Sequence, residues 1–461
     1  MSLIRDITKV SVANIISLAA VIITGFIVPG FLSIEQYAYL KTFTLVLSFV
    51  GILHLGYTDG IYIKYGGKYL KDLDLSMFKT EKTFFVLFQL CVAILILVVG
   101  IVLKEPIIIA VSAAVLPYNI ISYYQFFYQA VGQFNIYSGI RLTVPFIILV
   151  FNLLLIYVFK VTDYLYYIAG EIIAYIIIVA YIELYSYSNT KRLRITSNLK
   201  ILFENFRVGF FIMCGNLAMI LFFTLGRWAV KVFMTDADFA YFSFASSMMQ
   251  VITIVLSSVA MTFYPYLSRM ADKKNAVSLK RQLIIIGALL SSCYFIFSIA
   301  VKQFIPKYET SLKILGILFA SFPAYAVINA LYINLYKVLK DGKKYIKVIL
   351  TNLFISCIIT AMAIVINKNI ITISIATTIS YYFWLYYSAK DFEGLKPSLR
   401  EVIFIILYLV IFTGTMLLPN PFLGIIIFLP LVFLLSCLYT DELKELISKL
   451  SLLAIKKKNN K

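Results

Sequence analysis

Fourteen long apolar segments constrain this sequence more than any other feature. A helix that crosses a bilayer needs roughly 20 apolar residues. Segments of that length begin near Val10, Tyr37, Thr83, Ile107, Leu142, Tyr164, Val208, Phe239, Leu283, Leu312, Val348, Ile370, Val402 and Phe422. Their connections are short, and 62% of the 461 residues are hydrophobic. We therefore predict an all-α polytopic membrane protein with about 14 transmembrane helices.

The basic residues predict how these segments are oriented. One alternate set of connections holds 32 of the 41 Lys and Arg residues, and the opposite set holds seven. The positive-inside rule then places both termini in the cytoplasm, with residues 441–461 as a basic tail beside anionic membrane lipids. Because the net charge of +19 is explained by this placement, we expect no nucleic-acid partner.

The reactive side chains argue against an enzyme. Five cysteines lie singly in different apolar segments, and His54 is the one histidine, so we expect no metal site and no cofactor. A membrane-embedded polymerase or glycosyltransferase would carry a large extramembrane loop with clustered catalytic residues, and this sequence lacks one. We therefore expect a transporter.

An internal repeat relates the two halves of the chain. The stretch Phe31–Tyr39 aligns with Phe233–Tyr241 at an offset of 202 residues, and the same offset pairs Asn14 with Asn216. Each half then holds six spans, which predicts two lobes related by an axis along the membrane normal, with a substrate cleft between them. The expected parts are residues 1–189, a linker at 190–207, residues 208–389, and two further helices within 390–440.

The apolar segment Val208–Phe233 carries two cations one helical turn apart, Arg227 and Lys231. A charge at the centre of a spanning helix costs roughly 2.5–3.5 kcal/mol, so such residues usually face a protein-lined or watery interior. This favours an anionic substrate at both residues. In the alternative interpretation both side chains extend to the membrane surface, or Lys231 pairs with Asp236 or Asp238.

Intramembrane amides and carboxylates add further candidates. The amides expected to bind substrate hydroxyls are Asn14, Asn216, Gln125 and Gln250. Hydrogen bonds between helices are the alternative role for each of them. Glu171 and Asp59 are expected either to carry a coupling ion, H+ or Na+, or to form a charge pair within the protein.

Four stretches resemble the MOP exporter superfamily, specifically the Wzx-type flippases of O-antigen or capsule repeat units. They are Ile7–Asn14, Leu32–Tyr39, Leu55–Tyr62 and Tyr128–Phe134, and the resemblance extends over the whole chain. It implies a V of two six-helix lobes with a central cavity lined by cations, where Arg227 is a suitable residue. It also implies transfer of undecaprenyl-pyrophosphate-linked oligosaccharide to the outer leaflet of the bacterial inner (plasma) membrane by alternating access. The implied partners are this substrate, membrane lipids and polysaccharide polymerase machinery.

Two related classes stay open as alternatives. A MATE-like cation-coupled multidrug exporter would favour an acidic cavity and often a carboxylate in the first helix, where this chain has none after Asp6. MurJ-like lipid II flippases typically carry several arginines in the first two helices, which this chain also lacks. The balance of charge favours an anionic lipid-linked substrate.

Overall fold

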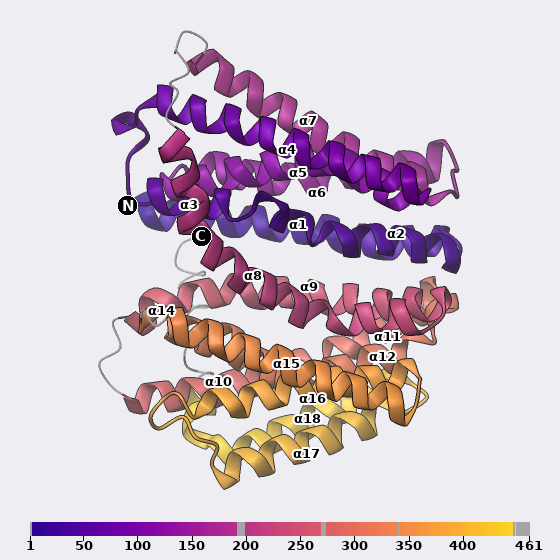
Figure 1. Cartoon of the computed structure of the whole chain (residues 1–461). Helices are drawn as coiled ribbons and strands as arrows, with labels where there is room; N and C mark the ends of the chain where they lie inside the picture. Colours follow the sequence, from indigo (N-terminus) through magenta and orange to yellow (C-terminus); the bar gives the residue numbers. More distant parts are fainter. Residues whose placement is uncertain (1, 191–198, 269–272, 340–341, 446–447, 449–461) are drawn as a thin grey trace, which may run out of the picture. The chain divides into compact units, whose positions relative to one another are not determined.

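A computed structural model of the chain describes residues 2–190, 199–268, 273–339, 342–445 and 448 (Figure 1). The side chains at 2–16, 187–190, 199–201, 258–259, 261–268 and 273–275 lie outside this description. Over the described residues the regular structure is entirely helical, as the sequence predicts. The helices form two compact units, Met1–Thr224 and Leu225–Lys461.

Within its described residues, the first unit holds seven long α-helices, one short α-helix, two 3₁₀ segments and one π-helical segment. In chain order the elements are α1 (Ser2–Phe31), α2 (Ile34–Leu47), η1 (Val50–His54), α3 (Tyr57–Tyr65), η2 (Leu70–Asp72), α4 (Leu75–Leu103), α5 (Pro106–Ala130), α6 (Phe134–Leu153), η3 (Leu154–Val158), α7 (Tyr164–Thr190) and most of α8 (Leu199–Phe233). The division between the units falls inside α8, whereas the sequence predicts domain boundaries at 189 and 208; those boundaries stay a prediction.

The second unit begins with the last turns of α8 and ends with an additional helix pair. Its further elements are α9 (Asp236–Ser268), α10 (Lys273–Leu290), α11 (Cys293–Phe304), η4 (Pro306–Tyr308), α12 (Ser311–Phe319), α13 (Phe322–Val327), η5 (Ile328–Tyr332), α14 (Ile333–Val338), α15 (Gly342–Ile366), α16 (Ile370–Ala389), α17 (Leu399–Met416), α18 (Pro421–Ser436) and η6 (Cys437–Tyr439).

Every expected span begins inside a helix. Among the described residues, 11 helices are long and apolar enough to cross a membrane, and the bent pair Ser311–Phe319 and Phe322–Val338 brings the number to 12. The remaining two expected spans fall on α1 and α16. Helix α16 is less apolar because it carries many hydroxyl side chains, and those of Ser374, Thr377 and Ser380 donate to backbone carbonyls one turn earlier. The chain is therefore a multi-pass membrane protein.

The packing of helices repeats between the two units. In the first unit α4 packs on α5, α6 on α7, and α5 on both α2 and α7. In the second unit α10 packs on α13, α15 on α16, and α12 on both α9 and α16, which are the counterparts in the same order. Helices α17 and α18 pack on each other and add to the second unit. The two six-helix repeats and the additional pair are thus confirmed.

The second span differs between the repeats. In the first unit it breaks at η1, after which Leu55 (φ 51°) and Gly56 (φ 84°) adopt left-handed backbone conformations before α3 begins. In the second unit α9 continues without interruption for 33 residues. The break leaves backbone carbonyls without helical donors. Two side-chain amides supply hydrogen bonds to these carbonyls: Gln89 donates to Leu53 O at 3.2 Å, and Asn119 donates to Val50 O at 3.3 Å.

Candidate functional site

Helix α8 packs against α3 through glycines. Gly56 and Gly60 are spaced by four residues, so they lie on one face of the chain entering α3. A Cβ atom at Gly209 of α8 would overlap the carbonyl oxygen of Gly56, and a Cβ at Gly60 would overlap the carbonyl oxygen of Asn205. Small residues allow this close approach of two backbones, which is how membrane helices pack most tightly. The sequence therefore fixes where the N-terminal half of α8 contacts the first unit.

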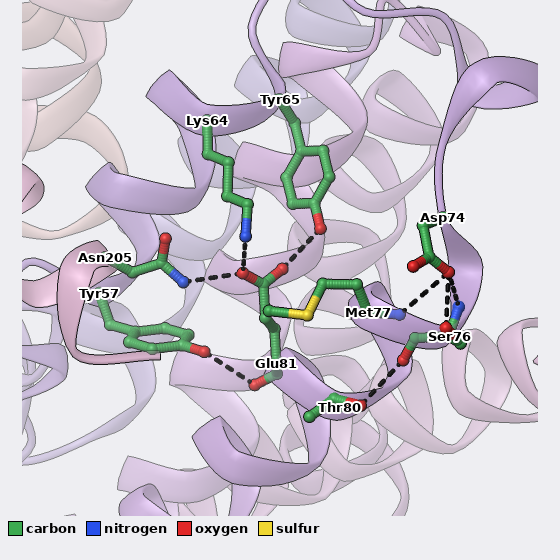
Figure 2. A network of polar contacts seen from close by, with 9 residues as sticks. All are labelled: Tyr57, Lys64, Tyr65, Asp74, Ser76, Met77, Thr80, Glu81 and Asn205. Atoms are coloured by element: carbon green, nitrogen blue, oxygen red, sulfur yellow. Dashed lines mark hydrogen bonds and ion pairs between the residues drawn. The ribbon is translucent and has the colours of Figure 1, made fainter. Parts of the chain in front are cut away.

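Asn205, whose carbonyl faces Gly60, also contacts a buried carboxylate, Glu81. Figure 2 shows Glu81 with the side chains around it. Glu81 on α4 is fully buried, and it accepts hydrogen bonds from Lys64 Nζ at 2.5 Å, Tyr65 Oη at 2.6 Å and Asn205 Nδ2 at 3.0 Å. Tyr57 donates to its backbone carbonyl at 3.1 Å. Three donors and one positive charge offset the cost of burying this charge. The carboxylate thereby joins α3, α4 and α8.

The tyrosines on α3 act as donors to this carboxylate in their neutral form. Helix α3 lies outside the apolar spans. Burial, and then the negative charge of Glu81, hold the pKa of Tyr57 and the pKa of Tyr65 far above the ordinary value for a phenol. Both hydroxyls therefore keep their protons, and the donors around Glu81 do not change with pH near neutrality.

Asp59, Asn216 and His54 form a second polar group on the same side of α8. Asn216 Nδ2 donates to Asp59 Oδ1 at 3.3 Å, and His54 Nε2 lies 3.8 Å from Asp59 Oδ2. The N–H of Gly56 donates to His54 Nδ1 at 3.0 Å, so a neutral His54 carries its proton on Nε2, facing Asp59. Burial raises the pKa of Asp59 to about 6. The pKa of this carboxylate is therefore shifted toward neutral pH.

Glu171 lies elsewhere in the first unit, on α7. Tyr175 donates to its Oε1 at 2.6 Å, and the positive charge of Lys41 on α2 attracts the carboxylate electrostatically. The Tyr175 ring meets Tyr118 edge to face at 5.7 Å between centroids. Glu171 and Asp59, the two carboxylates proposed for ion coupling, thus occupy separate environments.

The cations of α8 lie in its last turns, which belong to the second unit. Lys231 Nζ is 2.6 Å from Asp236 Oδ1, the ion pair that the second interpretation of the sequence allows. Lys231 Nζ also lies 5.3 Å from the centroid of Phe239, and Arg227 Cζ lies 5.9 Å from the same ring. Arg227 is half-buried. Two cations therefore share one aromatic face, a cation–π arrangement that stabilises positive charge away from water.

The structure brings together only some of the predicted residues. Asp59 and Asn216 are in contact in the first unit, and Arg227 and Lys231 share Phe239 in the second. The remaining predicted amides are Gln125, half-buried on α5, Gln250, exposed on α9, and Asn14, whose side chain lies outside the described residues. Substrate binding by the four amides and the two cations, and the coupling or charge-pair roles of Glu171 and Asp59, stay predictions.

Neither Glu81 nor Asn205 was predicted from the sequence as a site residue. Glu81 follows a lysine-rich connection and so resembles a solvated loop residue, while Asn205 lies among the basic residues expected to link the lobes. One signal was available: the spacing of Gly56 and Gly60 is typical of tightly packed membrane helices. It indicates a helix partner for α3 but does not identify α8.

Comparison with known proteins assigns the fold to a class. No family model and no curated protein matches the chain. Among solved structures it is similar to the lipid II flippase MurJ in an inward closed conformation (16% identity, TM-score 0.64, covering 95% of this chain and 99% of MurJ). It is also similar to an inward-facing multidrug-resistance MATE transporter of the MOP superfamily (12% identity, TM-score 0.60, covering 83% and 98%). A point mutant of the Vibrio cholerae MATE transporter VcmN matches as well (14% identity, TM-score 0.56, covering 86% and 98%).

At these identities the likeness defines a fold. The chain is a multi-pass membrane protein with the all-helical fold of MOP-superfamily transporters. The comparisons do not assign a substrate to this fold: MurJ is named as a lipid II flippase, and one of the MATE proteins as a multidrug-resistance transporter. The substrate class of this chain must therefore be inferred from its own charged residues.

Proposed function

We propose that the protein is a flippase that moves an oligosaccharide linked to undecaprenyl pyrophosphate from the cytoplasmic to the outer leaflet. The product would be used for surface polysaccharide such as O-antigen or capsule. The observation that carries this proposal is the position of Arg227 and Lys231 in the apolar helix α8, on a fold shared with transporters. A site for an organic cation would not be built around two positive charges.

The two cations have different roles in this proposal. Lys231 Nζ pairs with Asp236 Oδ1 at 2.6 Å. We assign the pyrophosphate to Arg227 because of the geometry of its side chain. A guanidinium presents a planar fork of N–H donors that matches phosphate oxygens, whereas an ammonium is a point charge. Phe239 holds both cations at its face and lowers the cost of keeping Arg227 in the membrane without a bound substrate.

Energy for transport would come from an ion, H+ or Na+, exchanged at a carboxylate of the first unit. Asp59 is the better candidate for H+, because its pKa of about 6 lies close to cytosolic pH. Glu171 is the second candidate. Membrane lipids surround the protein, and polysaccharide polymerase machinery would receive the product on the outer side.

The test of the proposal is substitution of Arg227 with leaflet-resolved measurement of the polyprenyl-linked sugar. Loss of a charge-assisted contact worth roughly 1.5–3 kcal/mol should weaken substrate binding by about 10- to 100-fold in Arg227→Ala. Arg227→Lys keeps the charge without the fork and should show an intermediate loss. Arg207→Ala removes an exposed arginine from the same helix and is the matched control, expected to transport normally.

Three outcomes would redirect the assignment. Normal flipping by Arg227→Ala at matched protein level would show that the arginine does not hold the substrate. Transport of lipid II in preference to a peptide-free lipid-linked oligosaccharide would favour the MurJ-like alternative. Export of an organic cation, unaffected by Arg227→Ala, would favour the MATE-like alternative.

A further inference from the structure

An open cavity of about 710 Å³ lies in the first unit, apart from the residues discussed above. It is bordered by the starts of η2 and α4 and by the ends of α5 and α7. Its lining includes five aromatic rings and a lysine: Tyr69, Phe78, Phe127, Tyr128, Tyr185 and Lys71. The volume is within the ~300–1,000 Å³ typical of small-molecule sites, and so large an aromatic share is a feature of binding pockets.

The aromatic walls are held in place by their neighbours. Phe78 and Phe127 pack with ring centroids 4.2 Å apart, and Tyr128 stacks on Tyr124 at 5.9 Å and 16°. Tyr124 in turn donates to Glu183 Oε1 at 2.9 Å. Rings fixed in this way lose little side-chain entropy when a ligand binds, so the cavity is preorganised.

Fixed backbone and charge contacts frame the same cavity. Gly67 N donates to Ala130 O at 3.3 Å, which ties the connection before α4 to the end of α5. Lys82 Nζ is 2.6 Å from Glu183 Oε2, which joins α4 to α7 just beyond the cavity wall. The elements around the cavity are thus linked independently of any ligand.

The cavity opens where the membrane surface is expected to meet the cytosol. The connection 64–82 that borders it carries five lysines, and the positive-inside rule assigns it to the cytoplasmic side. The last turns of α7 expose large side chains outward: Tyr181 and Leu184 are each 72% exposed and Tyr185 is 48% exposed. Exposed tyrosines beside exposed leucine are typical of the interfacial belt. An amphiphile could enter with its tail in the lipid.

We propose that this cavity holds the sugar head group of a lipid-linked oligosaccharide on the cytoplasmic side before translocation; this rests on the function proposed above. The negative faces of aromatic rings attract the weakly positive C–H groups of a sugar ring. Gln133 and Ser186 supply polar groups for its hydroxyls, and Lys71 supplies a charge for its phosphate. The exposed apolar surface of α7 accommodates the polyprenyl tail. An anionic phospholipid has the same charge and an apolar tail, but it has no sugar ring to pack against the five aromatic rings.

Binding by the full-length purified protein in nanodiscs tests the proposal. The probes are a polyprenyl diphosphate carrying an N-acetylhexosamine disaccharide, the same lipid without sugar, and phosphatidylglycerol. The variant Tyr69→Ala/Tyr185→Ala removes two exposed rings and should leave folding intact, and Tyr157→Ala is the matched control, an exposed ring of the same unit outside the cavity and outside α7. We expect the double variant to bind the sugar-bearing lipid about tenfold more weakly, with sugar-free binding unchanged.

The remaining outcomes overturn the proposal in distinguishable ways. If wild type binds the two polyprenyl lipids equally, or phosphatidylglycerol competes as well as the sugar-bearing lipid, the cavity is an anionic-lipid site. If wild type flips the sugar-bearing lipid while the double variant binds it normally, the cavity assignment alone fails and the flippase stands. If wild type neither binds nor flips this lipid, the proposed function fails with it.

Discussion

The bond between Glu81 and Asn205 should be measurable as a coupling between α4 and α8. Glu81 is fully buried and accepts three hydrogen bonds, so replacing it leaves Lys64 Nζ, Tyr65 Oη and Asn205 Nδ2 without their acceptor. Removing one partner of a buried charge pair costs roughly 3–5 kcal/mol. We therefore expect Glu81→Leu to lower the free energy of unfolding by about that amount. For a unit of this size, that corresponds to a fall of about 6–20 °C in the melting midpoint.

The partner variant Asn205→Leu should cost less. It removes one of three donors to a charged acceptor, a contact worth roughly 1.5–3 kcal/mol. If the two residues stabilise the protein through their mutual bond, the double variant Glu81→Leu/Asn205→Leu should be less destabilised than the sum of the single variants. The difference should be about 0.5–3 kcal/mol.

The assay is thermal unfolding in detergent followed by size-exclusion recovery, at equal protein concentration. Glu309→Gln is the matched control, because the Glu309 side chain is 60% exposed and lies 3.9 Å from Lys302. Its effect should stay within about 0.5 kcal/mol of wild type. Strict additivity of Glu81→Leu and Asn205→Leu would refute the bond, and with it the docking of α8 on α4.

Two further predictions concern the same helix contact. Gly209→Val should destabilise the protein strongly, because the valine side chain would overlap the Gly56 carbonyl. Gly139→Ala on α6 meets open space and should be neutral in the same unfolding assay. Equal effects of the two substitutions would contradict the close packing. Asp59 has a pKa of about 6 when folded against 3.8 as the ordinary value, so its charged form opposes folding by up to about 3 kcal/mol above pH 6. The stability of wild type relative to Asp59→Asn should therefore rise as the pH falls from 7 to 4, and a flat difference would show that Asp59 is not perturbed by burial.

The helical architecture could be predicted from the sequence because each span carries its own signal. Long apolar runs, basic connections and the offset of 202 residues are local or pairwise patterns, and the helical spans and the two repeats follow from them. The ion pair of Lys231 with Asp236 was open to prediction for the same reason, since the two residues are five positions apart.

The polar cluster at Glu81 could not be predicted in this way. Its burial depends on Asn205, 124 residues further along the chain, and on the break at η1 that redirects α3. The hydropathy pattern predicts that Lys64 and Glu81 are exposed charged residues in a loop. Nothing in the neighbouring sequence indicates that a distant helix covers them. Tertiary packing decides the environment of both residues.

The two halves of the sequence differ at residues that contact α8 and at a cation on α8 itself. At the offset of 202 residues, Gly60, Asp59 and Glu81 align with Thr262, Met261 and Leu283, so the second half has no equivalent of this docking surface. Arg227 aligns with Gly25, so the first half has no equivalent of that cation.

Helix α8 is continuous across the division between the units. Its first turns are fixed to the first unit by glycine contacts and a buried carboxylate, and its last turns carry the cations in the second. Neither feature recurs at the aligned positions of the other half of the sequence. If the function proposed above is correct, substitutions at either end of this helix should reduce flipping.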